Sequence, residues 1–523
     1  MPSQQHPFDP STRPSAPLRP RSGQAAFDRY APFTDLAALN EASTKPLRKS
    51  VRVNTLKTSV EKFTQAAHKK GWQLTSVPWC PEAFFVDRED RSVALGKDLL
   101  HLLGHVYMQE AASMLPAALL DPQPGEVILD MSAAPGSKTT QIASMMARSP
   151  STATSAARRG GGGQGVGVIV CNDVQEKRLW TLKTALHRSG VINNIVTKKV
   201  GQWFAKNMTG RFDRVLCDAP CTAQGTSRKD SDALLYCSLE NIGKMARLQR
   251  ELLESAVHAC KVGGRIVYST CTLTPEENEE VVASILHKFE GRVEVVDPRQ
   301  ERQAVSDERL AEIFERAVED SYRVQEFQTT GVPLTASRLP LLRLWPQTFD
   351  TEGFFCAVLK KVAPTREPER LPAVRYQEEI LPPARQKDIG KICEEMYGTS
   401  FLHEGDRLYL RADQLILTND AVSDFKLPVQ NYALGIPFAK KLDGTRIRLQ
   451  HEIVTLRGHE ATKNVLELSQ ADVDAMLDGK DIRCPVEMKG DPILTCGNLV
   501  IGSSLAKEGK LMNRLPRWIV AKS

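Results

Sequence analysis

The stretch that decides the fold is Asp130-Met131-Ser132-Ala133-Ala134-Pro135-Gly136-Ser137-Lys138-Thr139-Thr140-Gln141. A short apolar run, Glu126-Val127-Ile128-Leu129, stands in front of it, and a helical pattern follows from Ser137 to about Ala147. This order predicts a strand, a tight turn and the N-terminus of a helix, which is the place where an α/β sheet binds a cofactor. An ordinary connection stiffened by Pro135 is the alternative interpretation.

The residues of this turn narrow the kind of cofactor. Gly136 allows the backbone to approach a ligand closely, and Asp130 is placed at the carboxyl end of the strand to accept hydrogen bonds. A phosphate-binding P-loop needs a glycine directly before the lysine, but here Ser137 precedes Lys138. The turn therefore favours a nucleoside cofactor without a phosphate chain, and S-adenosylmethionine fits.

Length, charge and cysteine usage set the outer bounds. A chain of 523 residues should hold two to four domains, and its net charge of +6 permits a nucleic-acid partner without requiring one. No uninterrupted apolar run is long enough to cross a bilayer, so we expect no membrane partner. The 11 cysteines contain no C-x-x-C pair, which favours a reducing compartment, no bound metal, and a catalytic role for any special cysteine.

The central part of the chain alternates strands and helices. Strands are expected at 166–171, 194–197, 211–217 and 265–269, helices at 175–189 and 239–261, and a further helix that Pro275 opens. Two apolar strands at 339–344 and 354–361 close the pattern. This predicts an α/β fold with a doubly wound, Rossmann-like parallel sheet.

The part before this sheet divides into a tail and a small domain. Residues 1–28 are rich in proline and arginine and are expected to be a disordered tail; a mitochondrial transit peptide ranks second, because the prolines forbid a long amphipathic helix. Residues 29–113 read as a small α+β domain. In its strand Ser50–Asn54, we expect Arg52 and Asn54 to lie on a solvated face.

The α/β domain is expected over 114–362, followed by smaller units. A low-complexity insertion at 149–165 reads as a flexible linker, with RNA contact through Arg158 and Arg159 as the weaker alternative. Residues 363–385 read as a linker, 386–435 as a small connecting domain and 436–523 as a β-rich domain. The basic and aromatic residues near the end suggest a nucleic-acid module, and a basic solvated face is equally expected; these residues are Tyr432, Phe438, Lys507, Lys510, Arg514, Arg517, Trp518 and Lys522.

Chemically capable side chains stand at three strand ends. Asp173 ends the second strand of the sheet, where a carboxylate can hold the two hydroxyls of a cofactor ribose. The fourth strand ends in Asp218-Ala219-Pro220-Cys221 and the fifth in Ser269-Thr270-Cys271. A lone cysteine at such a place is usually a small buried hydrophobe, but two of them in turns beside a carboxylate form an unusual set.

Methylation of a pyrimidine at carbon 5 makes use of such a set. The reaction needs a nucleophile at carbon 6, and a thiolate serves well. A second group must remove the carbon-5 proton, and an acid or hydrogen-bonding group near ring nitrogen 3 must stabilise the adduct. Cys221, Cys271 and Asp218 could fill these three roles.

At these residues the chain resembles the Nop/Sun family of RNA 5-methylcytosine methyltransferases. The resemblance covers about Arg29 to Lys361, and it is strongest to bacterial members that act on ribosomal RNA. The motifs that carry it are Arg52-Val53-Asn54, Gln109 to Met114, the opening stretch, Asp218 to Cys221 with Gly225-Thr226, Arg228 to Asp230, Ser269 to Leu273 and Glu277 to Glu279; further likeness continues at Trp345-Pro346, Glu352 to Phe355 and Asn513 to Arg517.

The resemblance implies a role for each matching position. It implies that Cys271 is the nucleophile, that Cys221 assists proton removal and product release, that Asp218 contacts the cytosine edge and that Lys138 lies near the reacting centre. It also implies an RNA-binding domain at each end of the chain, the C-terminal one PUA-like. The residues expected to hold S-adenosylmethionine are Asp130, Ser132, Ala133, Ala134, Pro135, Gly136, Ser137, Lys138, Asp173 and Asp218.

One position departs from the family pattern. The family often has an acidic residue near the adenine after the third strand, and Val200 stands where we align it. Weak cofactor affinity is therefore an open possibility, and so is a non-catalytic RNA-binding assembly factor. A DNA cytosine methyltransferase, which would use the Pro-Cys position as nucleophile, leaves Cys271 without a role.

The sequence thus predicts an S-adenosylmethionine-dependent RNA (cytosine-5) methyltransferase. Ribosomal RNA is the expected substrate, with transfer RNA as the alternative. A monomer is expected, in the cytoplasm or in the nucleus and nucleolus, with a mitochondrial location ranked below both.

Overall fold

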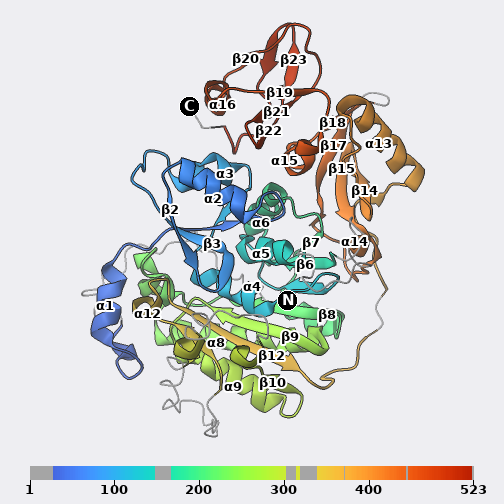
Figure 1. The fold of residues 1–523 in the computed structure, drawn as a ribbon. Helices are drawn as coiled ribbons and strands as arrows, with labels where there is room; N and C mark the ends of the chain where they lie inside the picture. The colour runs from blue at the N-terminus through green and yellow to red at the C-terminus, as the bar shows by residue number, and fades with distance from the viewer. Residues whose placement is uncertain are drawn as a thin grey trace, which may run out of the picture.

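The computed structural model describes residues 27–147, 166–301, 314–318, 339–369, 372–442 and 446–520. Nearly all of the expected tail at 1–28 and the whole insertion at 149–165 lie outside the described residues. Figure 1 shows the chain running from an N-terminal sheet in blue, through a central sheet in cyan to yellow, to C-terminal sheets in orange and red.

The N-terminal domain is a four-stranded antiparallel sheet with helices against it. Its strand order is β2-β3-β1-β4, from β1 (Ser50–Val53), β2 (Gln73–Val77), β3 (Cys80–Asp87) and β4 (Val106–Met108). Helices α2 (Val60–Lys69) and α3 (Leu99–Leu102) pack with this sheet, whereas α1 (Leu36–Thr44) packs against α12 (Pro346–Phe349) of the central domain. Ser59 caps α2 by accepting a hydrogen bond from the Lys62 amide.

The solvated strand face expected at Arg52 and Asn54 is wrong, because both side chains are buried against the central domain. Arg52 is 2% exposed; its Nε donates to Gln109 Oε1 at 2.9 Å and its Nη2 to Thr140 Oγ1 at 2.8 Å. Asn54 Nδ2 donates to the carbonyl oxygens of Gly104 and Ser189. The polar face of β1 is therefore the surface that holds the two domains together.

The central sheet has the order β10-β12-β9-β8-β5-β6-β7-β16, with β11 paired to β12. The five strands β5 to β9 are parallel: β5 (Val127–Asp130), β6 (Val168–Asn172), β7 (Asn194–Thr197), β8 (Phe212–Asp218) and β9 (Cys260–Thr270). The other four are antiparallel to their neighbours: β10 (Val293–Val295), β11 (Leu342–Leu344), β12 (Phe354–Lys361) and β16 (Ala433–Leu434). The parallel part confirms the Rossmann-like class.

Helices cover both faces of this sheet, because its strands are apolar on both sides. One buried cluster joins the sheet to α4 (Leu115–Leu120), α5 (Ser137–Met146) and α6 (Glu176–Ser189). A second joins the opposite face to α7 (Trp203–Asn207), α8 (Leu239–Ala259) and α9 (Glu279–Lys288). The short helices α10 (Pro298–Glu301) and α12 (Pro346–Phe349) follow β10 and β11 in the chain.

Strand order decides where ligands can bind. The chain moves outward from β5 through β6 to β7 on one side, and then returns to add β8 and β9 on the other. The carboxyl ends of β5 and β8 therefore flank the topological switch point, where an open α/β sheet forms its ligand crevice. Asp130 ends β5 and Asp218 ends β8.

A third, five-stranded sheet has the order β13-β14-β15-β17-β18. Its elements are β13 (Glu379–Ile380), α13 (Pro383–Tyr397), β14 (Asp406–Arg411), β15 (Gln414–Asn419), α14 (Asp420–Asp424), β17 (Ile436–Lys441) and β18 (Ile447–Leu449). Since β17 pairs with β15, the expected boundary between residues 435 and 436 falls inside this sheet. The loop at that boundary carries β16, which extends the central sheet beside β7.

The end of the chain forms two three-stranded sheets. Their elements are α15 (His451–Arg457), β19 (Val465–Glu467), α16 (Gln470–Leu477), β20 (Ile482–Arg483), β21 (Ile493–Cys496), β22 (Leu499–Ser503), β23 (Leu505–Lys507) and β24 (Lys510–Met512). Figure 1 places these sheets at the end of the molecule opposite α9 and β10. Within the described part of the chain, no helix is both long and apolar enough to cross a membrane.

The basic and aromatic residues of this region are less available than their sequence suggests. Phe438 is fully buried in the core around β17. Lys510 lies 2.8 Å from Asp481 and Arg514 lies 3.0 Å from Asp491, so two of the cations already have acidic partners. Trp518 is partly exposed and packs edge-on against His451. Lys522 lies outside the described residues.

Candidate active site

Two cysteines face each other at the carboxyl edge of the central sheet. Parallel pairing of β8 with β9 sets Asp218 beside Ser269, so the turns that follow the two strands start side by side. Cys221 lies in the first turn and Cys271 in the second, and their Sγ atoms are 3.3 Å apart. Both are partly buried free thiols, which is the state in which one can act as a nucleophile and the other as its hydrogen-bonding partner.

The two turns approach each other closely because Gly225 and Gly353 have no side chains to keep their backbones apart. The Gly225 amide donates to the Cys271 carbonyl oxygen at 3.0 Å, and the Gly353 amide donates to the Gly225 carbonyl oxygen at 2.9 Å. A Cβ atom on Gly225 would lie 2.2 Å from the Gly353 oxygen, so no larger residue fits. The segment Glu352–Gly353 thus supports the cysteine turns from outside.

Lys138 and Asp218 form an ion pair beside the cysteines. Lys138 Nζ lies 2.8 Å from Asp218 Oδ2, and Ser269 Oγ donates to Asp218 Oδ1 at 2.7 Å. Burial acts to lower the pKa of Lys138, but the Asp218 carboxylate, with a further contribution from Cys271, outweighs it and raises that pKa. Lys138 is therefore a fixed cation close to both Asp218 and Cys271.

The turn after β5 is fixed by its polar groups. Thr139 Oγ1 donates to Asp130 Oδ2 at 2.7 Å, while Asp130 Oδ1 is buried and accepts no hydrogen bond from the described residues. Burial, with the charge of Asp218 adding to it, raises the pKa of Asp130 to about 7. Gly136 has φ of +108°, and a Cβ there would lie 2.9 Å from the Ala185 Cβ. The Ala133 amide donates to the Asn172 carbonyl oxygen at 2.7 Å, which binds the turn to β6.

Asp173 follows β6 at the same edge. Its Oδ1 accepts from the Gln175 amide at 2.9 Å. Its Oδ2 is buried without a hydrogen bond from any residue that the structure describes, and Arg178 Nη1 lies 3.4 Å from it. A carboxylate oxygen with free accepting capacity suits a vicinal diol. Val200, after β7, is 55% exposed and offers no polar group at the matching place.

A buried carboxylate that sequence reasoning assigned no site role lies directly behind the cysteine turns. Glu277 belongs to the short 3-10 helix Pro275–Glu277 and is fully buried. Its carboxylate accepts hydrogen bonds from Thr222, the residue after Cys221, and from Gln249 of α8. In the sequence, Glu277 is notable only as part of the motif Glu277 to Glu279. The threonines that directly follow each cysteine are the signal that could have identified it.

Two further carboxylates, Glu110, half-buried, and Glu352, buried, lie near Lys138. The Glu352 amide donates to Glu110 Oε1 at 3.2 Å. Burial, reinforced by the charge of Glu110, raises the pKa of Glu352 to about 7. In the described ranges, no group of three or more histidine, cysteine or acidic side chains is arranged to hold a metal ion.

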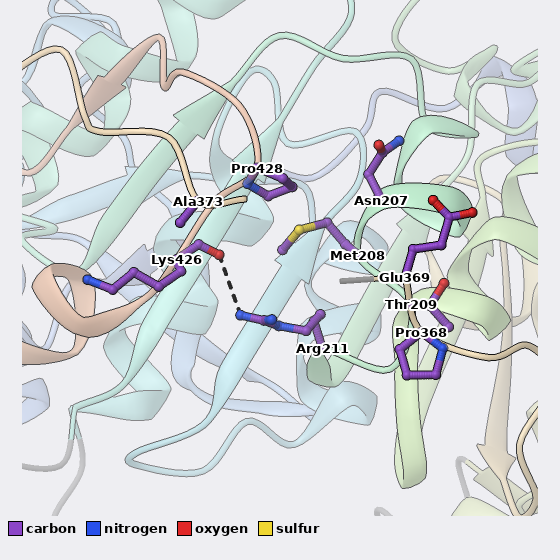
Figure 2. Close-up of a pocket in the computed structure, with 9 residues that line it drawn as sticks. All are labelled: Asn207, Met208, Thr209, Arg211, Pro368, Glu369, Ala373, Lys426 and Pro428. Carbon is purple, nitrogen blue, oxygen red and sulfur yellow. Dashed lines mark hydrogen bonds between the residues drawn. The ribbon is translucent and has the colours of Figure 1, made fainter. Parts of the chain in front are cut away.

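Figure 2 shows a separate hollow lined by Asn207, Met208, Thr209, Arg211, Pro368, Glu369, Ala373, Lys426 and Pro428. Arg211 donates to the Lys426 carbonyl oxygen at 3.4 Å, as the dashed line marks. Arg211 comes just before β8 begins, whereas Asp218 ends that strand, so the hollow lies at the opposite edge of the sheet from the cysteines. It contains no cysteine and is not the reactive centre.

The structure brings Lys138, Asp218, Cys221 and Cys271 together, and it places Ser132 to Ser137 and Asp173 in the adjoining turns. The strand order and the turn after β5 define a Rossmann-like α/β sheet with a ligand crevice at its switch point. Residues 117–159 and 163–360 match the family described as 16S rRNA methyltransferase RsmB/F, and residues 30–111 match the N-terminal domain of 16S rRNA methyltransferase RsmF. The chain belongs to the RsmB/F family.

Full-length relatives support this assignment. The chain is 34% identical to ribosomal RNA small subunit methyltransferase F of Psychromonas ingrahamii over 91% of this chain and 92% of that one. It is 33% identical to the protein of the same name from Vibrio cholerae, over 93% and 94% of the two chains. The solved structure of the protein PH0851 is similar over 66% of this chain and 70% of that one, with 25% identity and a TM-score of 0.50.

Proposed function

We propose that this protein is an S-adenosylmethionine-dependent RNA (cytosine-5) methyltransferase that acts on small-subunit ribosomal RNA through a covalent enzyme–cytosine adduct. The single observation that carries the proposal is the pair of thiols 3.3 Å apart beside the Lys138–Asp218 ion pair. Relatives along almost the whole chain are named for the small-subunit ribosomal RNA, which favours that substrate over transfer RNA.

The cofactor residues fit the group assigned to them. Asp173 Oδ2, which accepts no hydrogen bond from the described residues, suits the ribose diol, and Gly136 lets the turn after β5 pack closely against α6. S-adenosylmethionine, when bound, supplies an electrophilic methyl group from its sulfonium sulfur and leaves as a neutral thioether. Asp130 and Ser132 to Lys138 hold it on the β5 side, and Asp173 on the β6 side.

The electrostatics around the thiols favour different roles for the two cysteines. Hydrogen bonding to Cys271, followed by burial, raises the pKa of Cys221 well above its ordinary value. Lys138, by contrast, is close enough for the Cys271 charge to affect its pKa. Cys221 is therefore the thiol that donates to Cys271, and Cys271, beside the Lys138 cation, is the sulfur atom that attacks the base.

Each step then keeps its protons in balance. The Cys271 thiolate forms a bond to carbon 6, and the electron pair of the ring double bond moves to carbon 5, which accepts the methyl group. With the Cys271 charge consumed, Cys221 loses its proton to water. Cys221 then takes the carbon-5 proton, the ring double bond reforms, and the carbon–sulfur bond breaks to return the Cys271 thiolate. One proton leaves for each methyl group transferred.

Lys138 and Asp218 serve the cytosine. A carboxylate offers about four lone-pair sites, and Lys138 and Ser269 use two of those on Asp218. Asp218 can therefore still accept a hydrogen bond from the exocyclic amino group of the cytosine. Lys138 stabilises the negative charge that develops on the ring when the thiolate adds. The target base must be unpaired or flipped, because its carbon 6 has to meet the sulfur face-on.

The outer domains complete the proposal. The N-terminal domain and a PUA-like C-terminal domain bind RNA. Near the end of the chain, Lys507 and Arg517 are available for this, because neither forms an ion pair with an acidic residue of another element among the described residues. We propose a monomer. We place it in the cytoplasm because the relatives are bacterial; the comparisons give no support to the nuclear or nucleolar alternative.

The test uses purified protein, labelled S-adenosylmethionine and small ribosomal subunits or their naked RNA. Cys271→Ala should abolish 5-methylcytosine formation while leaving RNA binding intact. Cys237→Ala, at a half-buried cysteine outside the reactive pair, is the matched control and should stay active. Turnover by Cys271→Ala would contradict the covalent mechanism, and methylation of a base other than cytosine would contradict the substrate.

A further inference from the structure

The two cysteine turns are linked by a shared polar network. Each cysteine is followed directly by a buried threonine, Thr222 after Cys221 and Thr272 after Cys271. The two threonine hydroxyls lie 3.3 Å apart, and Gln224 accepts a hydrogen bond from Thr272 while donating to Thr222 at 2.6 Å. The sulfur atoms and the threonine hydroxyls therefore form two parallel contacts between the same two turns.

Glu277 lies at the centre of this network. The Thr222 amide donates to Glu277 Oε2 at 3.1 Å, and the Thr222 hydroxyl donates to Glu277 Oε1. The hydroxyls of Thr272 and Thr274 reach the same Oε1 at 3.4 and 3.1 Å. Because Thr272 gives its one hydroxyl proton to Gln224, the carboxylate accepts from Thr222 on the Cys221 side and from Thr274, three residues after Cys271, on the other side.

Glu277 is itself fixed from behind by rigid elements. Gln249 Nε2, on α8, donates to Glu277 Oε2 at 2.8 Å and to the Pro220 carbonyl oxygen at 2.8 Å. Tyr268 OH, on β9, donates to the Glu277 carbonyl oxygen at 2.6 Å. Because a helix and a strand both hold this carboxylate, it can transmit their rigidity to the turns.

We propose that Glu277 is the positioning residue of the reactive pair: its carboxylate joins the turn of Cys221 to the turn of Cys271 and keeps the two sulfur atoms in contact while RNA is attached. This inference rests on the proposed covalent function and deepens it. Glu277 makes no hydrogen bond to either sulfur atom, so it acts through Thr222 and Thr274 and is not itself a catalytic residue.

The step that depends most on this contact is release of the product. Cys271 can attack carbon 6 without help from Cys221, but the carbon-5 proton must reach a base held beside the adduct before the carbon–sulfur bond can break. If the Cys221 turn moves away from the Cys271 turn, addition and methyl transfer continue while elimination slows. Loss of Glu277 should therefore trap RNA on the enzyme and not merely lower activity.

The charge of Glu277 supports the same division of labour. It is among the causes that raise the pKa of Cys221, although hydrogen bonding to Cys271 and burial contribute more. A thiol with a raised pKa is a stronger base once its proton has left. Removing this charge should weaken Cys221 as the base for the carbon-5 proton.

The main experiment compares Glu277→Gln with Glu276→Gln. Glu276 is the preceding carboxylate of the same short helix, but it pairs with Arg29 at 2.6 Å and not with the cysteine turns. Each variant is incubated with target RNA and S-adenosylmethionine and run on a denaturing gel. We expect Glu277→Gln to accumulate covalent RNA at least about tenfold above wild type and Glu276→Gln, and to lose the adduct when Cys271→Ala is added.

Two further variants keep the inference testable if Glu277→Gln folds poorly. Thr222→Val removes one hydroxyl contact to the carboxylate and should give a smaller rise in adduct, whereas Glu277→Asp retains the charge and should restore part of the release rate. Wild-type adduct levels in both Glu277→Gln and Thr222→Val, or an equal rise in Glu276→Gln, would overturn the inference.

A measurement without RNA separates this inference from the proposed function. In the Cys271→Ala background, the rate of Cys221 alkylation is followed against pH by peptide mass spectrometry. Adding Glu277→Gln should move the midpoint to lower pH, and adding Glu276→Gln should leave it in place; an unmoved midpoint counts against the inference. If wild type makes no 5-methylcytosine, the proposed function fails, whereas an active wild type with no Glu277 effect overturns only this inference.

Discussion

Lys138 Nζ lies 2.8 Å from Asp218 Oδ2, which joins the first turn of α5 to the end of β8 across the switch point of the central sheet. One partner belongs to the turn expected to hold the cofactor, and the other begins the turn that carries Cys221. The ion pair therefore connects the two halves of the site, and the side chain of Phe354, whose ring centre is 5.5 Å from Nζ, covers the lysine.

Replacing Lys138 should impair chemistry much more than RNA binding. Lys138→Met keeps the apolar stem but removes the cation beside Cys271 and leaves Asp218 without its ion-pair partner. We expect the single-turnover rate of methyl transfer to fall about 10²- to 10³-fold, as for other fixed groups that stabilise developing charge. Lys177→Met, on the exposed face of α6, is the control. A rate within about threefold of wild type for Lys138→Met would contradict the role given to the cation.

Arg52 should couple the N-terminal domain to the cofactor turn. Arg52→Leu leaves Gln109 Oε1 and Thr140 Oγ1 without their donor, which should lower the free energy of unfolding by roughly 2 to 4 kcal/mol. Because Thr140 belongs to the first turns of α5, affinity for S-adenosylmethionine should fall as well. Denaturant melts and calorimetry measure the two effects.

The matched control for that prediction is Arg48→Leu. Arg48 comes from the same N-terminal segment, but its guanidinium lies over the Phe85 ring and is partly exposed. Its loss should cost less than about 1 kcal/mol and leave cofactor affinity unchanged. Equal effects of the two substitutions would show that Arg52 has no special link to the cofactor turn.

Three histidines, one buried and two largely buried, should make the fold sensitive to mild acid. Burial is the largest cause that lowers the pKa of His105, His187 and His451 to about 3, and the charge of Lys57 adds to it for His105 and His451. A lowered pKa means that the unfolded chain binds the proton first, so stability present above pH 6.5 is lost as the pH falls toward 3. Between about pH 6.5 and pH 5, each histidine should remove roughly 2 kcal/mol of unfolding free energy.

Thermal melts across this pH range test the histidine prediction. His451→Gln should flatten the decrease of the melting temperature with falling pH, because one of the protonating groups is gone. His68→Gln, at an exposed position on α2, should leave the slope as in wild type. A wild-type slope in His451→Gln would show that protonation of His451 does not contribute to the loss of stability in acid.

The parts of the site that the sequence predicted are those fixed by local geometry. Asp130, Asp173, Asp218 and Cys271 each stand where an apolar strand gives way to a turn, and parallel strands bring such ends to one edge. The Rossmann-like class followed from the same alternation. Periodicity and turn chemistry act over a few residues, so a single sequence can display them.

What the sequence could not reveal depends on contacts between distant segments. Glu277 reads as one of several acidic residues near a helix N-terminus, and only the fold shows that Thr222 and Gln249 surround it. Arg52 alternates with apolar neighbours, as a solvated residue of a strand does, yet its guanidinium is buried and donates to Thr140 of α5. Phe438 reads as a possible base-stacking aromatic, but the pairing of β17 with β15 buries it.

The most direct test of the central claim is covalent trapping with Cys221→Ala. The variant is incubated with ribosomal RNA and S-adenosylmethionine and run on a denaturing gel, and the retained RNA is sequenced. The account predicts a shifted protein band, RNA from one site of the small-subunit ribosomal RNA, and loss of the band in Cys221→Ala/Cys271→Ala. Full turnover by Cys221→Ala without an adduct, or an adduct that survives the loss of Cys271, would contradict it.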